Sequence, residues 1–353
     1  MLISIIIPTY NRSTLLFRTL LALENQIKNA NLCEEIEIIV TDNCSTDDTS
    51  VITKDWFKKT NIQGGFYCNS ENIGPDLNYL RGAKYASAKY LWILSDDDML
   101  LKNAIKNIYD LLKVNDVVYA FINYTVYVED HDEYHPIIID QDKIVSHEDL
   151  IVKTKLQASF LSASIYDREK FLNLDLSAHI YSFWLQLYAL KEITKLGNSL
   201  IISTPQIRMM KESLQQSRRL RQNANLEIHD ILMTAHINFL VFIKTFKSSE
   251  YSADFIQEIT NFGWQDNLNQ ILSYKLTKDE YHISQLNEVF YKMKRYFYDK
   301  PKFWLIHVPL LYSPKPVCRV YFSAILVRNS VKKLLRPFVA RFLPFLIKDR
   351  TVR

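Results

Sequence analysis

The segment YLWILSDDD, from Tyr90 to Asp98, decides the fold class of this chain. Its first five residues form a continuous apolar run, which is typical of a strand buried on both faces of a sheet. The run stops at Ser95, and three consecutive aspartates follow. The segment therefore predicts a buried strand with an acidic turn at its carboxyl end.

Similar strands precede this segment, and helices alternate with them. The apolar runs Ile3–Ile7 and Ile36–Val40 predict two buried strands, and Leu16, Leu20, Leu23 and Ile27 predict a helix between them. Three further helices are expected: one that begins at Thr46–Thr49, one from Pro75 to about Ala88 and one over Lys102–Lys113. Two further strands are expected over Gly65–Cys68 and Val117–Tyr124. This order predicts an α/β fold with a doubly wound, mostly parallel, Rossmann-like sheet.

The second half of the chain has a mixed pattern and then a helical one. Strands are expected near Ser159–Tyr166 and Ser199–Ser203, with a helix over Ser177–Leu196. After Pro205 the apolar spacing is helical. We therefore expect a catalytic and ligand-binding domain over residues 1–205, a helical region over 206–300, and a tail over 301–353.

Polar residues gather where the expected strands end. The four clusters are Pro8–Arg12, Asp42–Thr46, Asn69–Asp76 and Ser95–Asp98. Ligands of open α/β sheets bind outside the carboxyl ends of the strands, although strand-end loops are polar in any such protein. The distribution predicts a binding site at this edge.

Glycine is scarce: the chain has 353 residues and only 6 glycines. No glycine-rich phosphate loop can be written anywhere in the sequence, which excludes the two commonest backbone cradles for a nucleotide phosphate. A nucleotide phosphate would have to be bound by side chains or by a metal.

The acidic turn is the candidate metal site. Adjacent carboxylates repel one another, and oxygen ligands suit Mg²⁺ or Mn²⁺. Asp96 and Asp98 are the expected metal ligands, and the metal would offset charge on a departing nucleoside diphosphate. The alternative is a solvated acidic turn that caps the next helix.

Residues 3–102 resemble the nucleotide-sugar domain of the inverting family-2 glycosyltransferases with the GT-A fold. Within that family they are most similar to abequosyltransferase-like enzymes of O-antigen and capsule assembly. The segments that carry the resemblance are Ser4-Ile-Ile-Ile-Pro-Thr-Tyr-Asn-Arg12, Ile39-Val-Thr-Asp-Asn-Cys-Ser-Thr-Asp-Asp-Thr49, Asn72-Ile-Gly-Pro-Asp-Leu-Asn78 and Leu91-Trp-Ile-Leu-Ser-Asp-Asp-Asp98. Asn43-Cys44 departs from the family, which more often has Asp-Gly there.

The resemblance implies a role for each matching residue. Pro8, Thr9, Tyr10 and Arg12 would line the nucleoside pocket, and Asp42 would accept a hydrogen bond from a pyrimidine. Asn72 and Asn78 would occupy the loop beside the base or ribose. Asp96 and Asp98 would form the metal-binding pair, and Asp97 would contact ribose or metal. The donor would be a UDP-, dTDP- or CDP-sugar.

An inverting transfer also needs a group that takes the proton of the acceptor hydroxyl. The family often supplies it from a Glu-Asp pair 80–100 residues after the metal motif, and no such pair lies there in this chain. Asp175 and His179 are the candidates nearest to that place. For each of them a helix cap or a satisfied polar side chain is the competing interpretation.

The segment Arg208–Arg221 is basic. One hypothesis makes it a lid whose Arg218 closes over the diphosphate. The other makes it a solvated basic helix face.

The tail is strongly basic. Residues 315–353 hold ten Lys and Arg but one acid, whereas the whole chain has a net charge of +4. Apolar residues from Val327 to Phe345 recur at helical spacing among these charges, which predicts contact with an anionic membrane surface. Packing on the body of the protein, or on a second subunit of a homo-oligomer, is the alternative, and no nucleic-acid partner is expected.

The four cysteines match no zinc pattern, and the N-terminus lacks the features of a signal peptide. We expect a cytoplasmic enzyme, peripheral on the inner membrane, that transfers one sugar to an undecaprenyl-diphosphate-linked glycan. The alternatives are a transferase acting on a protein or a soluble glycan, and a nucleotide-binding scaffold without turnover.

Overall fold

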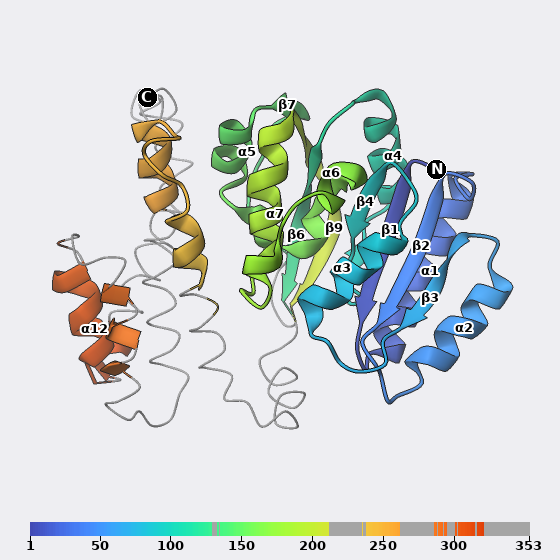
Figure 1. The fold of residues 1–353 in the computed structure, drawn as a ribbon, viewed down its shortest axis with the longest axis horizontal. Helices are drawn as coiled ribbons and strands as arrows, with labels where there is room; N and C mark the ends of the chain where they lie inside the picture. Colours follow the sequence, from blue (N-terminus) through green and yellow to red (C-terminus); the bar gives the residue numbers. More distant parts are fainter. Residues whose placement is uncertain are drawn as a thin grey trace. The chain divides into compact units, whose positions relative to one another are not determined.

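The strands of the protein form one sheet, and helices lie on both of its faces (Figure 1). The computed structural model describes residues 1–128, 133, 135–211, 235, 238–261, 286–287, 289–291, 293–294, 301, 303–314 and 316–320. These residues fall into two compact units. The first holds the described residues between Met1 and Leu226 together with Thr245–Ile259, and the second holds those of Glu227–Lys244 and from Thr260 onward.

One sheet organises the first unit. Its strands are β1 Ile3–Thr9, β2 Ile36–Asp42, β3 Gln63–Cys68, β4 Tyr90–Ile93, β5 Met99–Leu100, β6 Tyr119–Val128, β7 Lys143–Val145, β8 Ser164–Asp167 and β9 Ser199–Lys211. Their spatial order is β3-β2-β1-β4-β8-β6-β9-β5, with β7 also paired to β9. The first four strands in this order are mutually parallel, and β8 then pairs antiparallel with both β4 and β6. The predicted doubly wound α/β fold is confirmed, with a mixed second half.

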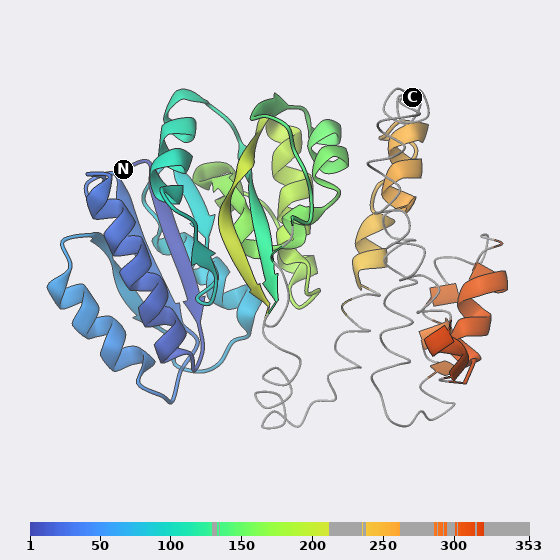
Figure 2. The same ribbon diagram turned by 180° about the vertical axis from the view of Figure 1, so that it is seen from behind.

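Helices cover both faces of this sheet. They are α1 Ser13–Asn29, α2 Thr49–Lys59, α3 Pro75–Tyr85, α4 Ala104–Val114, α5 His147–Thr154, α6 Arg168–Leu172 and α7 Leu185–Ile193. Helices α1 and α4 pack together on the face that is nearer in Figure 2, and α3, α6 and α7 lie on the face that is nearer in Figure 1. Short 3₁₀ turns are η1 Gln157–Ser159, η2 Leu161–Ala163, η3 Ser177–His179 and η4 Thr194–Leu196.

The core follows the predicted apolar spacing. Leu16, Leu20, Leu23 and Ile27 of α1 are buried, and every residue of β2 is buried. On the other face Gly82 lets α3 approach the sheet, because a Cβ there would lie 2.6 Å from Ile6 Cγ2. This close approach brings the N-terminus of α3 to the carboxyl ends of β1 and β2.

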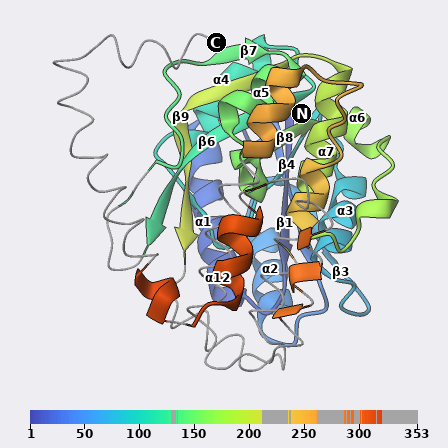
Figure 3. The ribbon, with the colours of Figure 1, turned by 90° about the vertical axis from the view of Figure 1, so that its left-hand side faces the viewer.

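The sequence predicts a strand that ends at Ser203, but β9 continues to Lys211 (Figure 3). It pairs with β6 over Ser199–Ile202 and again over Ile207–Lys211, and the register shifts between Ile122 and Tyr124. Pro205 donates no backbone hydrogen bond, so an irregular stretch of pairing accommodates it. The expected domain boundary at residue 205 therefore falls inside a strand.

The helix expected over Ser177–Leu196 is shorter than predicted. Turn η3 covers Ser177–His179, and α7 begins only at Leu185. Tyr181 and Phe183 have φ values of 64° and 68°, which a right-handed helix does not allow.

The second unit is helical in its described parts. They include a π-helical turn η5 over Phe303–His307 and helix α12 over Val308–Tyr312. No helix within the described residues is long and apolar enough to cross a membrane. Of the basic tail, only residues 316–320 are described, so the predicted amphipathic segment lies outside them.

Candidate active site

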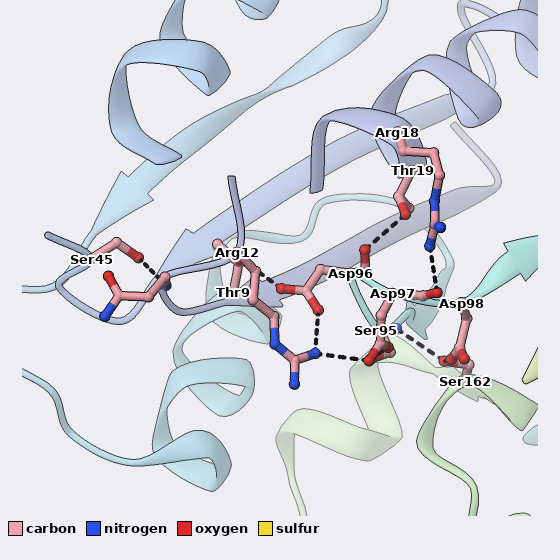
Figure 4. A network of polar contacts seen from close by, with 11 residues as sticks. Thr9, Arg12, Arg18, Thr19, Ser45, Ser95, Asp96, Asp97, Asp98 and Ser162 are labelled. Atoms are coloured by element: carbon pink, nitrogen blue, oxygen red, sulfur yellow. Dashed lines mark hydrogen bonds and ion pairs between the residues drawn. The ribbon is translucent and has the colours of Figure 1, made fainter. Parts of the chain in front are cut away.

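The acidic turn after β4 is tied to the end of β1 (Figure 4). Thr9 Oγ1 donates to Asp96 Oδ2 at 2.7 Å, and Thr19 Oγ1 of α1 donates to the Asp96 backbone oxygen at 2.9 Å. Arg18 holds the next backbone oxygen, that of Asp97, at 2.8 Å. Residues of β1 and α1 therefore fix the direction in which the aspartates point.

Arg12 lies between two of the three carboxylates. Its Nη1 contacts Asp96 Oδ1 at 2.9 Å and Asp97 Oδ2 at 2.8 Å, as Figure 4 shows. Burial raises the pKa of Asp96, and the Arg12 guanidinium opposes that rise. The guanidinium thus supplies positive charge at the point where the sequence predicts a cation.

Asp98 is in a different environment, because it lies deep in the fold. Its Oδ2 accepts a hydrogen bond from Ser162 Oγ at 2.6 Å, and Ser162 Oγ accepts one from Ser95 N at 2.9 Å. Burial, reinforced by the nearby Asp97 charge, raises the pKa of Asp98 to about 8. In this environment Asp98 keeps its proton more readily than an exposed aspartate does.

The aspartates provide oxygen donors of the type that Mg²⁺ and Mn²⁺ prefer. However, no group of three or more acidic, His or Cys side chains converges on a metal position within the described residues. Because Arg12 holds Asp96 and Asp97, the metal hypothesis depends chiefly on Asp98.

A cavity of about 630 Å³ opens beside Asp96. The ends of β1 and β4, the start of α3 and the segment before α7 form its walls. Its lining residues are Pro8, Thr9, Tyr10, Arg12, Asn43, Asn72, Pro75, Asp76, Asn78, Tyr79, Ser95, Asp96, Leu161, Tyr181, Phe183 and Gln186. The structure thus brings together most of the residues expected to bind a nucleotide.

An amide network fixes the wall formed by the start of α3. Asn43 Nδ2 donates to Asn72 Oδ1 at 2.7 Å, and Asn69 Nδ2 donates to both Asn43 Oδ1 and Asn78 Oδ1 at 3.0 Å. Asn78 Nδ2 donates in turn to the Thr41 backbone oxygen at 2.9 Å. Asn43, Asn69 and Asn78 are buried, so much of their hydrogen bonding shapes the loop.

Asp42 does not line the cavity. It is fully buried, and its Oδ1 accepts hydrogen bonds from the backbone nitrogen and the hydroxyl of Ser45. Its Oδ2 accepts one from the Cys68 thiol at 3.5 Å. In this arrangement the carboxylate that was expected to bind the nucleobase instead stabilises the loop after β2.

Asp175 and His179, the expected proton acceptors, lie away from this cavity. Asp175 lines a neighbouring one beside α3, and its Oδ1 accepts from Ser177 Oγ at 2.6 Å, which lowers its pKa. The His179 ring stacks on Tyr188 with ring centroids 3.6 Å apart, and burial lowers its pKa.

Part of the predicted lid segment is a strand. Arg208 lies in β9, where it forms a bidentate ion pair with Glu133 at 3.1 and 2.8 Å. This corrects the expectation of a basic helix or lid that begins at this residue. Arg218 lies outside the described residues.

Four residues of the site were not predicted from the sequence: Asp76, Ser162, Tyr181 and Phe183. Asp76 lies within the recognised Asn72–Asn78 motif, whose position could have indicated it. Ser162 is 64 positions from Asp98, and no local pattern joins the two. Tyr181 and Phe183 enter the cavity through an unusual backbone conformation that their residue types disfavour.

A match to a protein-family profile identifies the class of this protein. A parallel half-sheet carries loop clusters and an acidic turn at its carboxyl edge, and the sequence profile of "Glycosyl transferase family 2" matches residues 4–187. The chain belongs to this family.

Curated relatives in the family include enzymes of bacterial glycan assembly. The chain is 42% identical over 105 residues to the abequosyltransferase RfbV of Salmonella typhimurium, covering 30% of this chain and 31% of that protein. It is 27% identical over 192 residues to the GalNAc(5)-diNAcBac-PP-undecaprenol beta-1,3-glucosyltransferase of Campylobacter jejuni, covering 53% and 59%. The matches therefore span less than two thirds of either relative.

Solved structures share the fold at low identity. TarS 1–349 of S. aureus superposes with a TM-score of 0.60 at 16% identity, over 86% of this chain and 82% of that one. The same protein has been solved in complex with UDP-GlcNAc. This likeness confirms the GT-A type of sheet.

Proposed function

We propose that this chain is an inverting glycosyltransferase that moves a single sugar from a UDP-, dTDP- or CDP-sugar to a hydroxyl of a glycan acceptor. The observation that carries the proposal is the junction of Thr9, Arg12 and Asp96 in one cavity. It joins the loop expected to bind the nucleoside to the acidic turn expected near the diphosphate. The family membership and the named activities of the relatives support the same conclusion.

The reaction would be a direct displacement at the anomeric carbon. The acceptor oxygen forms a bond to that carbon while the bond from the carbon to the diphosphate oxygen breaks, so that the configuration inverts. A divalent Mn²⁺ or Mg²⁺ ion, held by Asp98 with Asp96 nearby, would offset the charge on the departing diphosphate. Arg12 contributes its own positive charge at the same edge.

The acceptor hydroxyl must lose a proton in this step, and we propose Asp76 as the group that takes it. Asp76 is buried and lines the cavity with Asp96. Its Oδ2 accepts a hydrogen bond from Tyr181 N at 2.8 Å, and burial raises its pKa toward the range useful for a base. Asp175 and His179 remain the hypotheses that the sequence suggests for this role.

The acceptor is proposed to be a lipid-linked O-antigen or capsule intermediate, carried on undecaprenyl diphosphate. The printed name of the Campylobacter relative includes an undecaprenol-linked substrate, which supports this choice. The basic tail would hold the enzyme on the cytoplasmic face of the inner membrane. A transferase that acts on a protein or a soluble glycan would need no such tail contact.

The decisive experiment measures nucleoside diphosphate released from a panel of UDP-, dTDP- and CDP-sugars, with Mn²⁺ and with EDTA. Release from at least one donor, stimulated by Mn²⁺, is the expected result. If no donor releases nucleotide and none binds, the enzyme proposal fails. If a donor binds without release, a scaffold role is favoured.

A further inference from the structure

The segment between η3 and α7 exposes two aromatic side chains in a strained backbone. Tyr181 is 62% exposed and Phe183 is 46% exposed, and both residues have positive φ. The left-handed region carries an energetic cost for a residue with a bulky side chain, because its Cβ crowds the following carbonyl oxygen. Neither residue regains this cost by burying its ring, so folding alone does not explain the arrangement. Strain of this kind concentrates at functional sites.

Specific contacts hold the segment in this shape. The Tyr181 backbone N–H donates to Asp76 Oδ2 at 2.8 Å, and the Tyr181 hydroxyl donates to the Ile73 backbone oxygen at 3.4 Å. The ring lies against Gly74, where a Cβ would be 3.0 Å from Tyr181 Cε1. Trp184 N donates to Ser182 Oγ at 3.1 Å and closes the turn before α7. The start of α3 therefore fixes where the Tyr181 ring lies.

Both residues line the cavity that holds Asp96. Tyr10, which is also exposed, lines it from the end of β1. A pyranose ring has an apolar face of C–H groups and an edge of hydroxyl groups. Aromatic faces bury such apolar surface, and polar groups around them bind the hydroxyls. Asp76, Asp96 and Gln186 supply polar groups in the same lining.

We infer that Tyr181 and Phe183 form a stacking platform for a sugar ring in this cavity. The inference deepens the proposed function and rests on it, because it names the residues that would select the sugar. The ring belongs either to the acceptor or to the transferred sugar of the donor. Asp76 acts as a positioning residue for the platform through its bond to the Tyr181 backbone.

The test removes each ring by a substitution that is compatible with the native backbone conformation. Asn tolerates positive φ, so Tyr181→Asn, Phe183→Asn and the double variant remove the rings while the Tyr181 N–H remains available to Asp76. Phe17→Ala is the control, because Phe17 is an exposed aromatic of α1 that does not line the cavity. Circular dichroism and melting temperature verify folding.

Two binding measurements on the full chain distinguish the two sources of the sugar. The acceptor arm measures binding of octyl β-glucoside, octyl β-galactoside and octyl N-acetyl-β-glucosaminide by saturation-transfer NMR. The donor arm measures Kd for UDP-glucose and UDP-GlcNAc relative to UDP, by calorimetry. We expect the affinity of the double variant to be lower by about tenfold or more in one of the two arms, which corresponds to the loss of two ring contacts. We expect UDP affinity to stay within about twofold.

Each outcome has a distinct meaning. If only the affinity for the octyl glycosides falls, the platform binds the acceptor. If only the affinity for the UDP-sugars relative to UDP falls, the platform binds the sugar of the donor. Wild-type-like values in both arms, or an equal loss in Phe17→Ala, overturn the platform. A wild-type protein that binds no nucleotide and releases none from any donor contradicts the proposed function instead, and the glycoside arm still reports on the platform.

Discussion

Ser162 Oγ donates to Asp98 Oδ2 at 2.6 Å and links η2 to the acidic turn after β4. Ser162 has no exposed surface, and its oxygen also accepts from the backbone of Ser95. This hydroxyl therefore orients the buried carboxylate on which the metal hypothesis depends.

Ser162→Ala should destabilise the protein by about 1–3 kcal/mol, because it leaves a buried carboxylate and a backbone N–H without their partner. It should also reduce Mn²⁺-stimulated nucleotide release. Urea unfolding and the release assay measure the two effects. Ser177→Ala is a matched control, since Ser177 Oγ makes the same 2.6 Å bond to the exposed Asp175. The interpretation fails if both variants change stability equally.

Arg12→Ala should increase the affinity of the free enzyme for Mn²⁺ by about three- to tenfold. It removes the positive charge that lies between Asp96 and Asp97, so that two carboxylates need another cation. Titration calorimetry or electron paramagnetic resonance without nucleotide measures this. Asp98→Asn should have the opposite effect. Unchanged Mn²⁺ affinity in Arg12→Ala would show that the guanidinium and the metal do not compete.

Asp76→Asn should lower sugar transfer by about 10²–10⁴-fold if its carboxylate takes the proton, while UDP affinity changes little. The variant keeps an oxygen that can accept from Tyr181 N, so the loop should stay in place. Asp175→Asn and His179→Gln should retain turnover close to that of the wild type, because neither residue lines the cavity. A large loss in Asp175→Asn alongside an active Asp76→Asn would return the role to Asp175.

His147 should make the free energy of unfolding depend on pH. Its Nδ1 lies 2.6 Å from Thr194 Oγ1 and its Nε2 lies 3.2 Å from the Tyr251 hydroxyl, and burial lowers its pKa to about 4. The unfolded chain takes up this proton near pH 6.5, so it binds more protons than the folded chain between pH 6.5 and 4. The contribution of His147 to the free energy of unfolding is therefore complete above pH 6.5 and is lost as the pH decreases toward 4.

His147→Gln should remove this slope, which we expect to be on the order of 1–3 kcal/mol between pH 7 and 4 after allowance for partial exposure. Urea unfolding at pH 7, 5.5 and 4.5 measures it. A variant with the same pH slope as the wild type would assign the acid sensitivity to other groups.

The parallel half of the fold could be predicted from the sequence because its signals are local. Apolar runs set β1, β2 and β4, and Pro75 begins α3 as expected. The four polar clusters follow from where those strands end, and all four contribute residues to the lining of one cavity. The strand ends and the polar residues that follow them could therefore be predicted from the sequence.

The second half was less predictable because long-range pairing decides it. Strand β9 runs past Pro205 since β6 supplies partners on both sides of the irregularity. The break before α7 depends on Asp76, which holds Tyr181 across 105 positions. No window of neighbouring residues contains either interaction.

The continuation of β9 has a practical consequence for anyone who wishes to shorten this protein. A fragment that ends at residue 205 would remove the partners of Met99 and Leu100 and of the last residues of β6. Unpaired backbone at such an edge promotes association between copies. Fragments for crystallisation should therefore extend at least through Lys211, and the contacts of Lys191 with Thr245 argue for retaining the chain through Ile259 as well.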